Sequence, residues 1–513
     1  MNSLDPATGS LIGELEATSP DLIQGIVSEA RSAQQEWSRL PLRKRSERIR
    51  QFGEILVSRK RIAAELISQE NGKPIAESYT SEIIPTLDIV RYYAYRSAGA
   101  IKDRRVHNRI PLMKTKKAFV RYEPYGVIGI ISPWNYPLLL PCGQIIPALM
   151  TGNTVVFKPS EYTPLVGDMI AQFLWETGIP RKVFNIVQGG GDVGAALACS
   201  KVNKLFFTGS TATGKKISGL AANTLTPLSL ELGSKDAMIV LDDADIDSAA
   251  SGAIWGSLMN AGQTCVSIER CFVHEKIYDR FLDVLQTKIK KLRTGKGSDA
   301  GTDIGPIIHK AQFDTIRFQV EDAVRKGARI AAGGDFLEKN GTYFISPTVL
   351  IDLPKECSLM TEETFGPVLP ITRFSSDDEA IGLANDSRFG LAASVWTADK
   401  KRGMAIAQRL QAGAVILNDI ISYYGNSDGV VGGPKESGSG RVHGREGLFE
   451  MVFPKYYEIE RAWRTKKLWW YPYDSTLLHF FEATVDLLFS KSLFAKSKSL
   501  LKLVPNFLRI KKI

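Results

Sequence analysis

The sequence predicts an α/β protein with two doubly wound lobes, because short apolar runs alternate with helical stretches in two separate series. In the first series we expect strands at 127–131, 154–158, 183–187 and 205–208, with helices at 144–150, 164–176 and 192–199. In the second we expect strands at 238–241, 329–332, 368–374, 394–397 and 414–418. Ligands of such folds bind beyond the carboxyl ends of parallel strands, so a cleft is expected between the lobes.

Length and composition indicate a globular protein with more than one core. The chain has 513 residues, 44% of them hydrophobic and 23% charged. Its five cysteines are scattered, which disfavours a disulfide framework and a metal site. The stretch from Tyr125 to Phe157 is uncharged, but its prolines would break a membrane-spanning helix. No secretory signal is visible at the start, so a cytoplasmic location is expected.

The net charge of +10 is concentrated near the carboxyl terminus. Residues 455–513 hold 12 Lys and Arg against 5 Asp and Glu, a net charge of +7. The rest of the chain is close to neutral and carries no nucleic-acid-binding motif, so we expect no nucleic-acid partner. Elsewhere, 20–60 has helical patterning, and 107–123 and 451–462 look like strands outside both lobes.

Cys265 lies among small and hydrogen-bonding residues, in the segment Ala261-Gly262-Gln263-Thr264-Cys265-Val266-Ser267. No second cysteine or histidine stands near it at metal-ligand spacing. On this segment alone a buried structural thiol is favoured, since free cysteine packs like a small hydrophobe. A nucleophile is the alternative, and it requires catalytic partners elsewhere in the chain.

A glycine-containing turn follows the expected strand at 205–208 and opens a helix, where backbone N–H groups can bind a phosphate. Gly209 and Gly214 precede Lys215 as in a nucleotide-triphosphate loop, but Lys216 stands where that loop needs Ser or Thr for magnesium. An ATPase or GTPase is therefore disfavoured, and a phosphate site and a plain turn stay open.

Lys158 and Glu161 end the expected strand at 154–158, at the same sheet edge. This pair could bind a ribose through its hydroxyl groups, and the alternative is an ordinary surface turn. Asn135, next to Trp134, is fixed between two prolines, and its amide could donate to an oxyanion or serve only the loop. Glu231 lies in an apolar setting that favours a proton acceptor, and a capped or ion-paired acid is the alternative.

Together these segments resemble the aldehyde dehydrogenase superfamily over about residues 5–462. The motifs occur in the family's order and at near-family separations. They are Trp134-Asn135-Tyr136-Pro137, Lys158-Pro159-Ser160-Glu161, Phe207-Thr208-Gly209-Ser210, Glu231-Leu232-Gly233, Gly262-Gln263-Thr264-Cys265, Glu363-Thr364-Phe365-Gly366-Pro367 and Gly432-Gly433-Pro434-Lys435-Glu436-Ser437-Gly438.

The resemblance implies a role for each site residue. Cys265 is the expected nucleophile, Asn135 the oxyanion donor and Glu231 the base that activates water to hydrolyse a cysteine thioester. The residues expected to bind the cofactor are Trp134, Lys158, Glu161, Gly209, Ser210, Glu363 and Phe365. A carboxylate at Glu161 would repel a 2′-phosphate, so NAD is expected in preference to NADP.

The resemblance also implies the domain organisation. We expect a dinucleotide-binding domain, a catalytic domain, a small β element that makes a homodimer or homotetramer, and a helical extension. Their expected bounds are 1–105 with 125–232, 233–450, 106–124 with 451–463, and 464–513.

The expected substrate is an apolar aldehyde, medium- or long-chain or aromatic, oxidised to its carboxylic acid. Relatives that use acidic semialdehydes often carry an arginine after the asparagine loop, and 138–144 has no positive charge. The alternatives are a semialdehyde dehydrogenase, such as one for succinate semialdehyde, an acylating relative that uses coenzyme A, and a non-catalytic membrane-attached scaffold.

The extension at 464–513 combines aromatic, apolar and basic residues, and 491–513 has seven basic residues and no acid. This composition is typical of an amphipathic helix at a membrane surface. It faintly resembles the tails of fatty aldehyde dehydrogenases. Peripheral attachment to a membrane is one interpretation, and packing on the enzyme body or on a partner subunit is the other.

Overall fold

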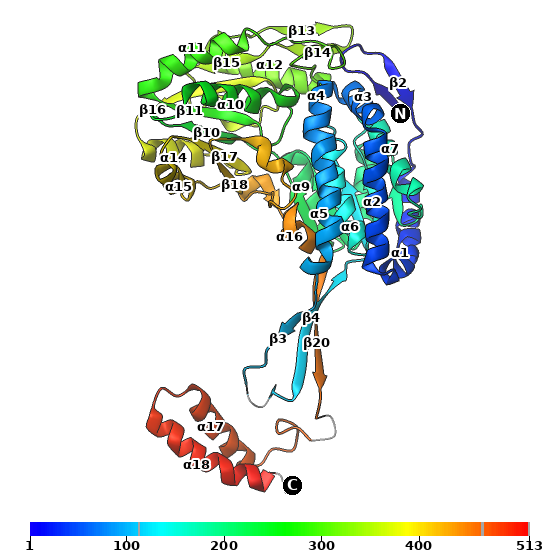
Figure 1. The fold of residues 1–513 in the computed structure, drawn as a ribbon, viewed down its shortest axis with the longest axis vertical. Helices are drawn as coiled ribbons and strands as arrows, with labels where there is room; N and C mark the ends of the chain where they lie inside the picture. The colour runs from blue at the N-terminus through cyan, green and yellow to red at the C-terminus, as the bar shows by residue number, and fades with distance from the viewer. Residues whose placement is uncertain (111–112, 463–465, 511–513) are drawn as a thin grey trace. The chain divides into compact units, whose positions relative to one another are not determined.

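The computed structural model describes residues 1–110, 113–462 and 466–510 (Figure 1). They form two compact units, one of residues 1–102 and 122–454 and the other of residues 103–121 and 455–513. The predicted α/β fold with two sheets is confirmed in the first unit. The predicted boundary between the dinucleotide-binding and catalytic domains stays a prediction.

A six-stranded sheet forms the first lobe, in the order β19-β9-β8-β5-β6-β7. All its strands are parallel except the short edge strand β19. The four strands predicted in the first series are found to within one residue at either end. The bounds are β5 Val127–Ile131, β6 Thr154–Lys158, β7 Phe184–Ile186, β8 Lys204–Thr208, β9 Leu228–Glu231 and β19 Gly438–Ser439.

Helices cover this sheet, and the predicted helical stretch at 20–60 is divided into two helices next to Pro41 (Figure 1). All of α6 is buried, which explains its uncharged sequence. The helices of this lobe are α1 Ile23–Arg39, α2 Leu42–Ser58, α3 Lys60–Asn71, α4 Ile75–Glu77, α5 Ile84–Ala100, α6 Leu139–Met150, α7 Pro164–Glu176, α8 Gly191–Cys199 and α9 Thr211–Ala222.

The second lobe has a seven-stranded sheet in the order β12-β15-β16-β11-β10-β17-β18, parallel except for β12. Its bounds are β10 Asp236–Val240, β11 Ile268–His274, β12 Arg329–Ala332, β15 Thr348–Ile351, β16 Val368–Phe374, β17 Ala392–Trp396 and β18 Ala414–Leu417. The helices are α10 Ile246–Leu258, α11 Tyr278–Ile289, α12 Lys310–Arg325, α13 Ser358–Thr361, α14 Asp377–Asn385 and α15 Lys400–Ala407. The short helix α16 Gly444–Phe449 packs on α5 and α6 of the first lobe.

The strand order places β11 between β10 and β16, and the sequence analysis missed this strand. All seven residues of β11 are buried, yet they include Glu269, Arg270 and His274. These charged residues interrupt the apolar run by which a buried strand is normally recognised. Two small antiparallel pairs complete the unit, namely β1 Asn2–Leu4 with β2 Leu11–Glu14 and β13 Phe336–Lys339 with β14 Thr342–Ile345.

The second unit contains a three-stranded antiparallel sheet and two helices. The sheet order is β20-β4-β3, with bounds β3 Arg104–Val106, β4 Lys116–Pro124 and β20 Val452–Glu460. The strand predicted over 107–123 is wrong for residues 107–110 and 113–115, which are not in a strand, and residues 111–112 lie outside the described part of the chain. Helices α17 Ser475–Phe489 and α18 Leu493–Ile510 pack on each other. Among the residues described, no helix has the length and apolar character needed to cross a membrane.

Candidate active site

Cys265 follows a turn with a strained backbone. Asn260, Ala261 and Gly262 have φ values of 54°, 54° and 71°, a region that side chains rarely adopt. A Cβ atom on Gly262 would lie 2.1 Å from the carbonyl oxygen of Gly366, so only glycine fits there. The nucleophile candidate is therefore carried by a turn that is locked against the loop before β16.

Asn135 lies in the loop between β5 and α6, buried next to the Cys265 segment. Its side-chain Nδ2 donates to the carbonyl oxygen of Gln263 at 3.1 Å, and its Oδ1 has no partner among the described residues. Gln263 is held in turn, because its Nε2 donates to the carbonyl oxygen of Asn260 at 2.9 Å. The amide of Asn135 is thus directed at the turn that precedes Cys265, and its role as an oxyanion donor stays a prediction.

Glu231 is the last residue of β9 and is buried at the carboxyl edge of the first sheet. Burial raises the pKa of its carboxyl well above the usual range, the charge of Arg441 opposes this rise, and Glu450 adds to it. A carboxyl group with a raised pKa is a stronger base once it is ionised. This environment suits the predicted role in activating water.

The thiol of Cys265 is in an acidic neighbourhood. Burial raises the pKa of this thiol, and the carboxylates of Asp236, Glu231 and Glu363 raise it further. Negative charge on sulfur is therefore disfavoured in the free protein. Thiolate formation needs a proton acceptor or the loss of neighbouring negative charge.

A cleft of about 680 Å³ opens from Cys265 along the carboxyl edge of the first sheet. The structure brings all ten predicted site residues to the lining of this cleft. They are Cys265, Glu231, Asn135, Trp134, Lys158, Glu161, Gly209, Ser210, Glu363 and Phe365. They meet there because β5, β6, β8 and β9 are parallel and end at one edge.

Lys158 and Glu161 form an ion pair, with 3.1 Å between Nζ and Oε2. The Lys158 side chain is 5% exposed and that of Glu161 is 43% exposed, so the carboxylate is the member that solvent and ligands reach. Ser210 caps α9, and its hydroxyl accepts from the backbone N–H of Thr213 at 3.3 Å. The amino terminus of α9, where the helix dipole favours an anion, faces the same cleft.

Glu363 and Phe365 come from the loop before β16, on the second lobe. Glu363 Oε1 accepts from the backbone N–H of Ser234 at 2.9 Å, and burial together with Glu269 raises the pKa of Glu363 to about 8. Phe365 meets Trp134 edge to face, with 5.5 Å between ring centroids. Residues of both lobes are thus in contact across the cleft.

The sequence analysis missed several residues of the cleft. Gly190 and Gly191, at the start of α8, line it together with His309. The three consecutive glycines at 189–191 after an expected strand were a signal for the first two. His309 stacks on the ring of Tyr162, with 4.6 Å between centroids, and no local pattern indicates this long-range contact.

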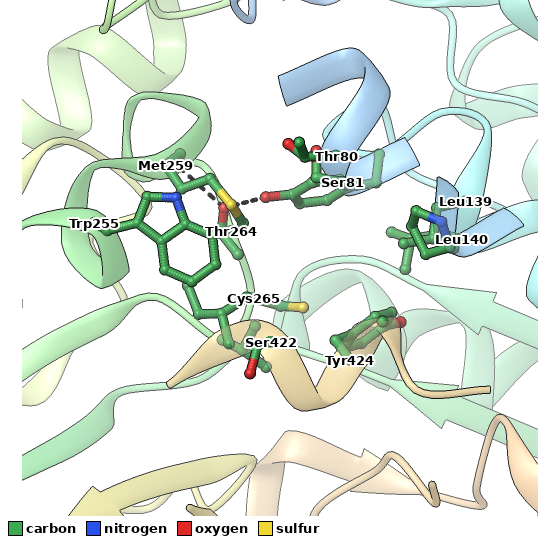
Figure 2. A pocket seen from close by; sticks show the side chains of 15 residues that line it. Thr80, Ser81, Leu139, Leu140, Trp255, Met259, Thr264, Cys265, Ser422 and Tyr424 are labelled. Atoms are coloured by element: carbon green, nitrogen blue, oxygen red, sulfur yellow. Dashed lines mark hydrogen bonds between the residues drawn. The ribbon is translucent and has the colours of Figure 1, made fainter. Parts of the chain in front are cut away.

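A second, smaller cavity of about 100 Å³ also reaches Cys265 (Figure 2). Its lining carries no charged side chain and comes from η2 Ser78–Ile83, α6, α10, the Cys265 turn and residues 421–425. The residues that line it are Thr80, Ser81, Pro85, Tyr136, Leu139, Leu140, Trp255, Met259, Thr264, Cys265, Val266, Ile421, Ser422, Tyr424 and Gly425. Cys265 is therefore accessible from two cavities of different chemistry.

The cleft between the two α/β lobes combines a helix amino terminus, an ion pair with an exposed carboxylate and a cysteine, an arrangement typical of dinucleotide-dependent oxidoreductases. The model of the aldehyde dehydrogenase family matches residues 1–456. A 4,4′-diapolycopene aldehyde oxidase of a Methylomonas species is 35% identical, over 95% of this chain and 91% of that protein.

Solved structures agree with this match. An aldehyde dehydrogenase from Bacillus cereus in complex with NAD⁺ is 34% identical, with a TM-score of 0.86 over 90% of this chain and 93% of that one. An NADP-dependent enzyme of Escherichia coli is also 34% identical, with a TM-score of 0.85 over 90% and 94%. The chain belongs to the aldehyde dehydrogenase family and is an oxidoreductase.

The cleft fits a nicotinamide dinucleotide. The helix amino terminus at Ser210, the carboxylate of Glu161 and the carboxyl of Glu363 line one cavity, which offers a site for a pyrophosphate and acceptors for sugar hydroxyls. The backbone of Gly209 lies close to the ring of Phe207, because a Cβ at this position would be 2.6 Å from that ring. NAD(P) is accordingly the cofactor that these residues fit.

Proposed function

We propose that the protein oxidises an apolar aldehyde to its carboxylic acid with NAD, through a thioester on Cys265. One observation carries the proposal, namely that Cys265 lines both the uncharged cavity and the dinucleotide-type cleft. An aldehyde in the first cavity and a nicotinamide in the second would then meet at one sulfur atom.

We assign a residue to each chemical step. The Cys265 thiol gives its proton to solvent water in the cleft, and the thiolate attacks the aldehyde carbon. The C=O π bond opens, and the resulting oxyanion is held by Asn135 Nδ2 and the backbone N–H of Cys265. The nicotinamide, when bound, accepts the hydride and so supplies the two-electron oxidation. Glu231 then takes a proton from water, the hydroxide attacks the thioester, and the C–S bond breaks to release the acid and the Cys265 thiolate.

The substrate class rests on the smaller cavity. Its walls are Leu139, Leu140, Trp255 and other apolar groups with several hydroxyls, and among the described residues no cation lines it that could bind the carboxylate of a semialdehyde. The relative named for 4,4′-diapolycopene aldehyde supports the same class. A semialdehyde such as succinate semialdehyde would leave its carboxylate without a partner.

Steady-state NADH production across hexanal, decanal, benzaldehyde and succinate semialdehyde tests the substrate class. We expect kcat/KM to rise with the apolar surface of the aldehyde, by about tenfold for each 1.4 kcal/mol of added transition-state binding. Succinate semialdehyde serves as the charged control, and the highest kcat/KM on that compound would contradict the proposal.

The preference for NAD rests on Glu161. Its exposed carboxylate lines the cleft, and a 2′-phosphate placed beside it would meet a like charge.

Homo-oligomerisation rests on the three-stranded sheet. In the described part of the chain, β20 is an edge strand of this sheet, and its Tyr456 and Ile459 are exposed. An edge strand with exposed apolar side chains is suited to pair with another chain, so a homodimer or homotetramer is proposed.

Attachment to a membrane surface rests on the helix pair α17 and α18. Phe489, Leu493, Phe494 and Leu501 are each at least 70% exposed. Lysines at 491, 496, 498 and 502 lie among them without an acidic residue. Apolar side chains can enter the headgroup region while the lysines bind anionic lipid, so an anionic membrane surface is the proposed partner.

A further inference from the structure

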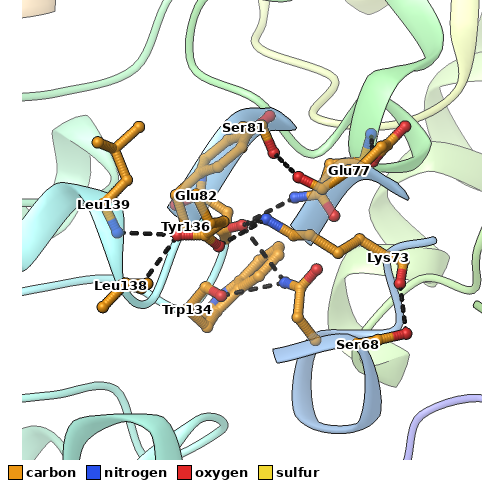
Figure 3. A network of polar contacts seen from close by, with 12 residues as sticks. Ser68, Lys73, Glu77, Ser81, Glu82, Trp134, Tyr136, Leu138 and Leu139 are labelled. Carbon is orange, nitrogen blue, oxygen red and sulfur yellow. Dashed lines mark hydrogen bonds and ion pairs between the residues drawn. The ribbon is translucent and has the colours of Figure 1, made fainter. Parts of the chain in front are cut away.

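Lys73 and Glu82 form an ion pair that is completely shielded from solvent. Both side chains are 0% exposed, and Lys73 Nζ lies 2.8 Å from Glu82 Oε1 (Figure 3). Lys73 follows α3, and Glu82 lies in η2. Burial lowers the pKa of Lys73 and raises that of Glu82, and each charge opposes the shift of the other.

The pair binds the loop that carries Asn135. Lys73 Nζ also donates to the backbone carbonyl oxygen of Asn135 at 2.8 Å and lies 3.9 Å from the ring centroid of Tyr136. Glu82 Oε2 accepts from the backbone N–H groups of Leu138 and Leu139, at 3.1 and 2.8 Å. The two charges therefore hold the chain on both sides of the proline that follows Tyr136 (Figure 3).

The carbonyl of Asn135 receives further donors. Asn260 Nδ2 donates to it at 2.9 Å, and Asn71 Nδ2 donates at 3.4 Å. The backbone carbonyl of Asn135 is thus fixed by three side chains from two other segments, and its side-chain amide donates to the Cys265 turn. The backbone N–H of Asn260 is anchored as well, since it donates to Glu77 Oε2 at 2.9 Å.

Stability alone is a poor explanation for this network. Taking a lysine and a glutamate out of water costs several kcal/mol, and apolar side chains of the same volume often replace such pairs without loss. What the ion pair adds is a fixed geometry with directional hydrogen bonds. That geometry is needed most where an oxyanion donor must be held to a fraction of an ångström.

We propose that Lys73 and Glu82 are positioning residues for aldehyde oxidation, which act by fixing the Asn135 backbone so that its side-chain amide meets the oxyanion. The inference rests on the proposed function, because it takes Asn135 as the oxyanion donor. Neither Lys73 nor Glu82 lines the cavity or the cleft at Cys265, so their effect is indirect.

A second buried pair offers a matched control. Lys235 and Glu269 have side chains 0% and 3% exposed, and their Nζ and Oε2 atoms lie 2.7 Å apart. This pair binds a different loop, because Lys235 donates to Thr364 Oγ1 at 2.8 Å and Glu269 accepts from the backbone N–H of Phe365 at 2.8 Å. Loss of either lysine leaves one buried carboxylate, but only loss of Lys73 frees the Asn135 loop.

The test is a double-mutant cycle on the full-length protein with decanal and NAD. Lys73→Met should lower kcat/KM for decanal about 10- to 100-fold, the loss expected for a misplaced oxyanion donor. The same substitution in an Asn135→Ala background should cost little more, because the amide that it positions is already gone. Lys235→Met should lower kcat/KM by the same factor in the wild-type and the Asn135→Ala backgrounds.

Rescue and folding controls complete the test. Lys73→Arg keeps the cation and its donors and should recover most of the activity. Glu82→Gln keeps the side-chain volume but removes the charge that pairs with Lys73 Nζ, so it should lower kcat/KM for decanal as Lys73→Met does. The folded fraction of each variant is measured by far-ultraviolet circular dichroism and by thermal melting. If Lys73→Met does not fold, Glu82→Gln enters the same cycle in its place.

Two results would overturn the inference. One is that Lys73→Met, or Glu82→Gln if it takes its place, lowers kcat/KM by the same factor in the Asn135→Ala background as in the wild type. The other is unchanged kcat/KM in a folded variant. Failure of the proposed function looks different, since Asn135→Ala itself would then leave aldehyde oxidation unaffected.

Discussion

At Glu231, burial determines the pH at which the hydrolytic step can run. Because burial raises the pKa of this carboxyl, it stays protonated at pH values where an ordinary glutamate is ionised. The base form appears only as pH rises through the raised pKa, so turnover limited by hydrolysis should increase with pH above the usual glutamate range. Steady-state NADH production as a function of pH measures this rise.

Glu231→Gln removes the base and keeps the shape of the side chain. We expect steady-state turnover to fall about 100-fold or more, while a first burst of NADH remains because Cys265 still forms the thioester. The pH-dependent rise should disappear with it. Stopped-flow absorbance separates burst from turnover, and wild-type turnover in the variant would show that another group activates water.

Gly262 tests how firmly the Cys265 turn is locked. Gly262→Ala places a Cβ 2.1 Å from the carbonyl oxygen of Gly366, at a φ of 71° that alanine tolerates poorly. We expect a loss of at least about 2 kcal/mol in the free energy of unfolding, measured by urea denaturation. Gly219→Ala in α9 is the control, because a Cβ there meets no atom within 4 Å and the helix should gain stability.

Glu161 should determine the choice of cofactor. With NAD, kcat/KM should exceed the value with NADP by about tenfold or more, and Glu161→Gln should reduce that ratio. Glu176→Gln, at the exposed end of α7 and paired with Arg59, is a charge-matched control that should leave the ratio unchanged. A wild-type preference for NADP would contradict the assignment of Glu161.

At the scale of elements, four of the six strands of the first lobe could be predicted because their sequences are locally consistent, whereas β9 and the two-residue β19 were missed. Strands such as β5 and β6 are continuous apolar runs, and glycines or prolines mark their ends. Strand β11 could not be predicted, because it contains the buried charges of Glu269 and Arg270. Their partner Lys235 is more than 30 residues away in the sequence and meets them only in the folded chain.

The candidate site shows the same division. Motif order was enough to collect ten residues that the structure brings to one cleft. It gave no indication of Lys73 and Glu82, which act on the site through a loop more than 50 residues away in the sequence. Contacts of that kind follow from tertiary packing and leave no local pattern.

The helix pair α17 and α18 should direct the protein to anionic membranes. Replacement of Phe489, Leu493 and Phe494 by serine removes three of the most exposed apolar side chains of the helix pair, so binding should fall at least about tenfold. Co-sedimentation with vesicles of phosphatidylserine and phosphatidylcholine measures it. Ile62→Ser, an exposed apolar site in α3, is the control, and equal, negligible sedimentation of wild type and variant would contradict the proposal.

At the scale of the whole molecule, a membrane-attached helix pair and an uncharged cavity would be complementary. An apolar aldehyde is concentrated in lipid, so an enzyme held at that surface would encounter its substrate where it is most abundant. Loss of residues 464–513 should then reduce oxidation of decanal supplied in vesicles more than that of hexanal supplied in solution.

The two cavities at Cys265 also determine how ligands compete. Among the described residues, Cys265 and Leu140 are the only lining residues that the aldehyde cavity and the dinucleotide cleft share. A ligand in one site therefore does not fill the other. An inert apolar amide lodged beside Trp255 would therefore compete with aldehyde while leaving NAD free to bind. Inhibitors of this protein should be of two kinds, those that compete with the aldehyde and those that compete with NAD.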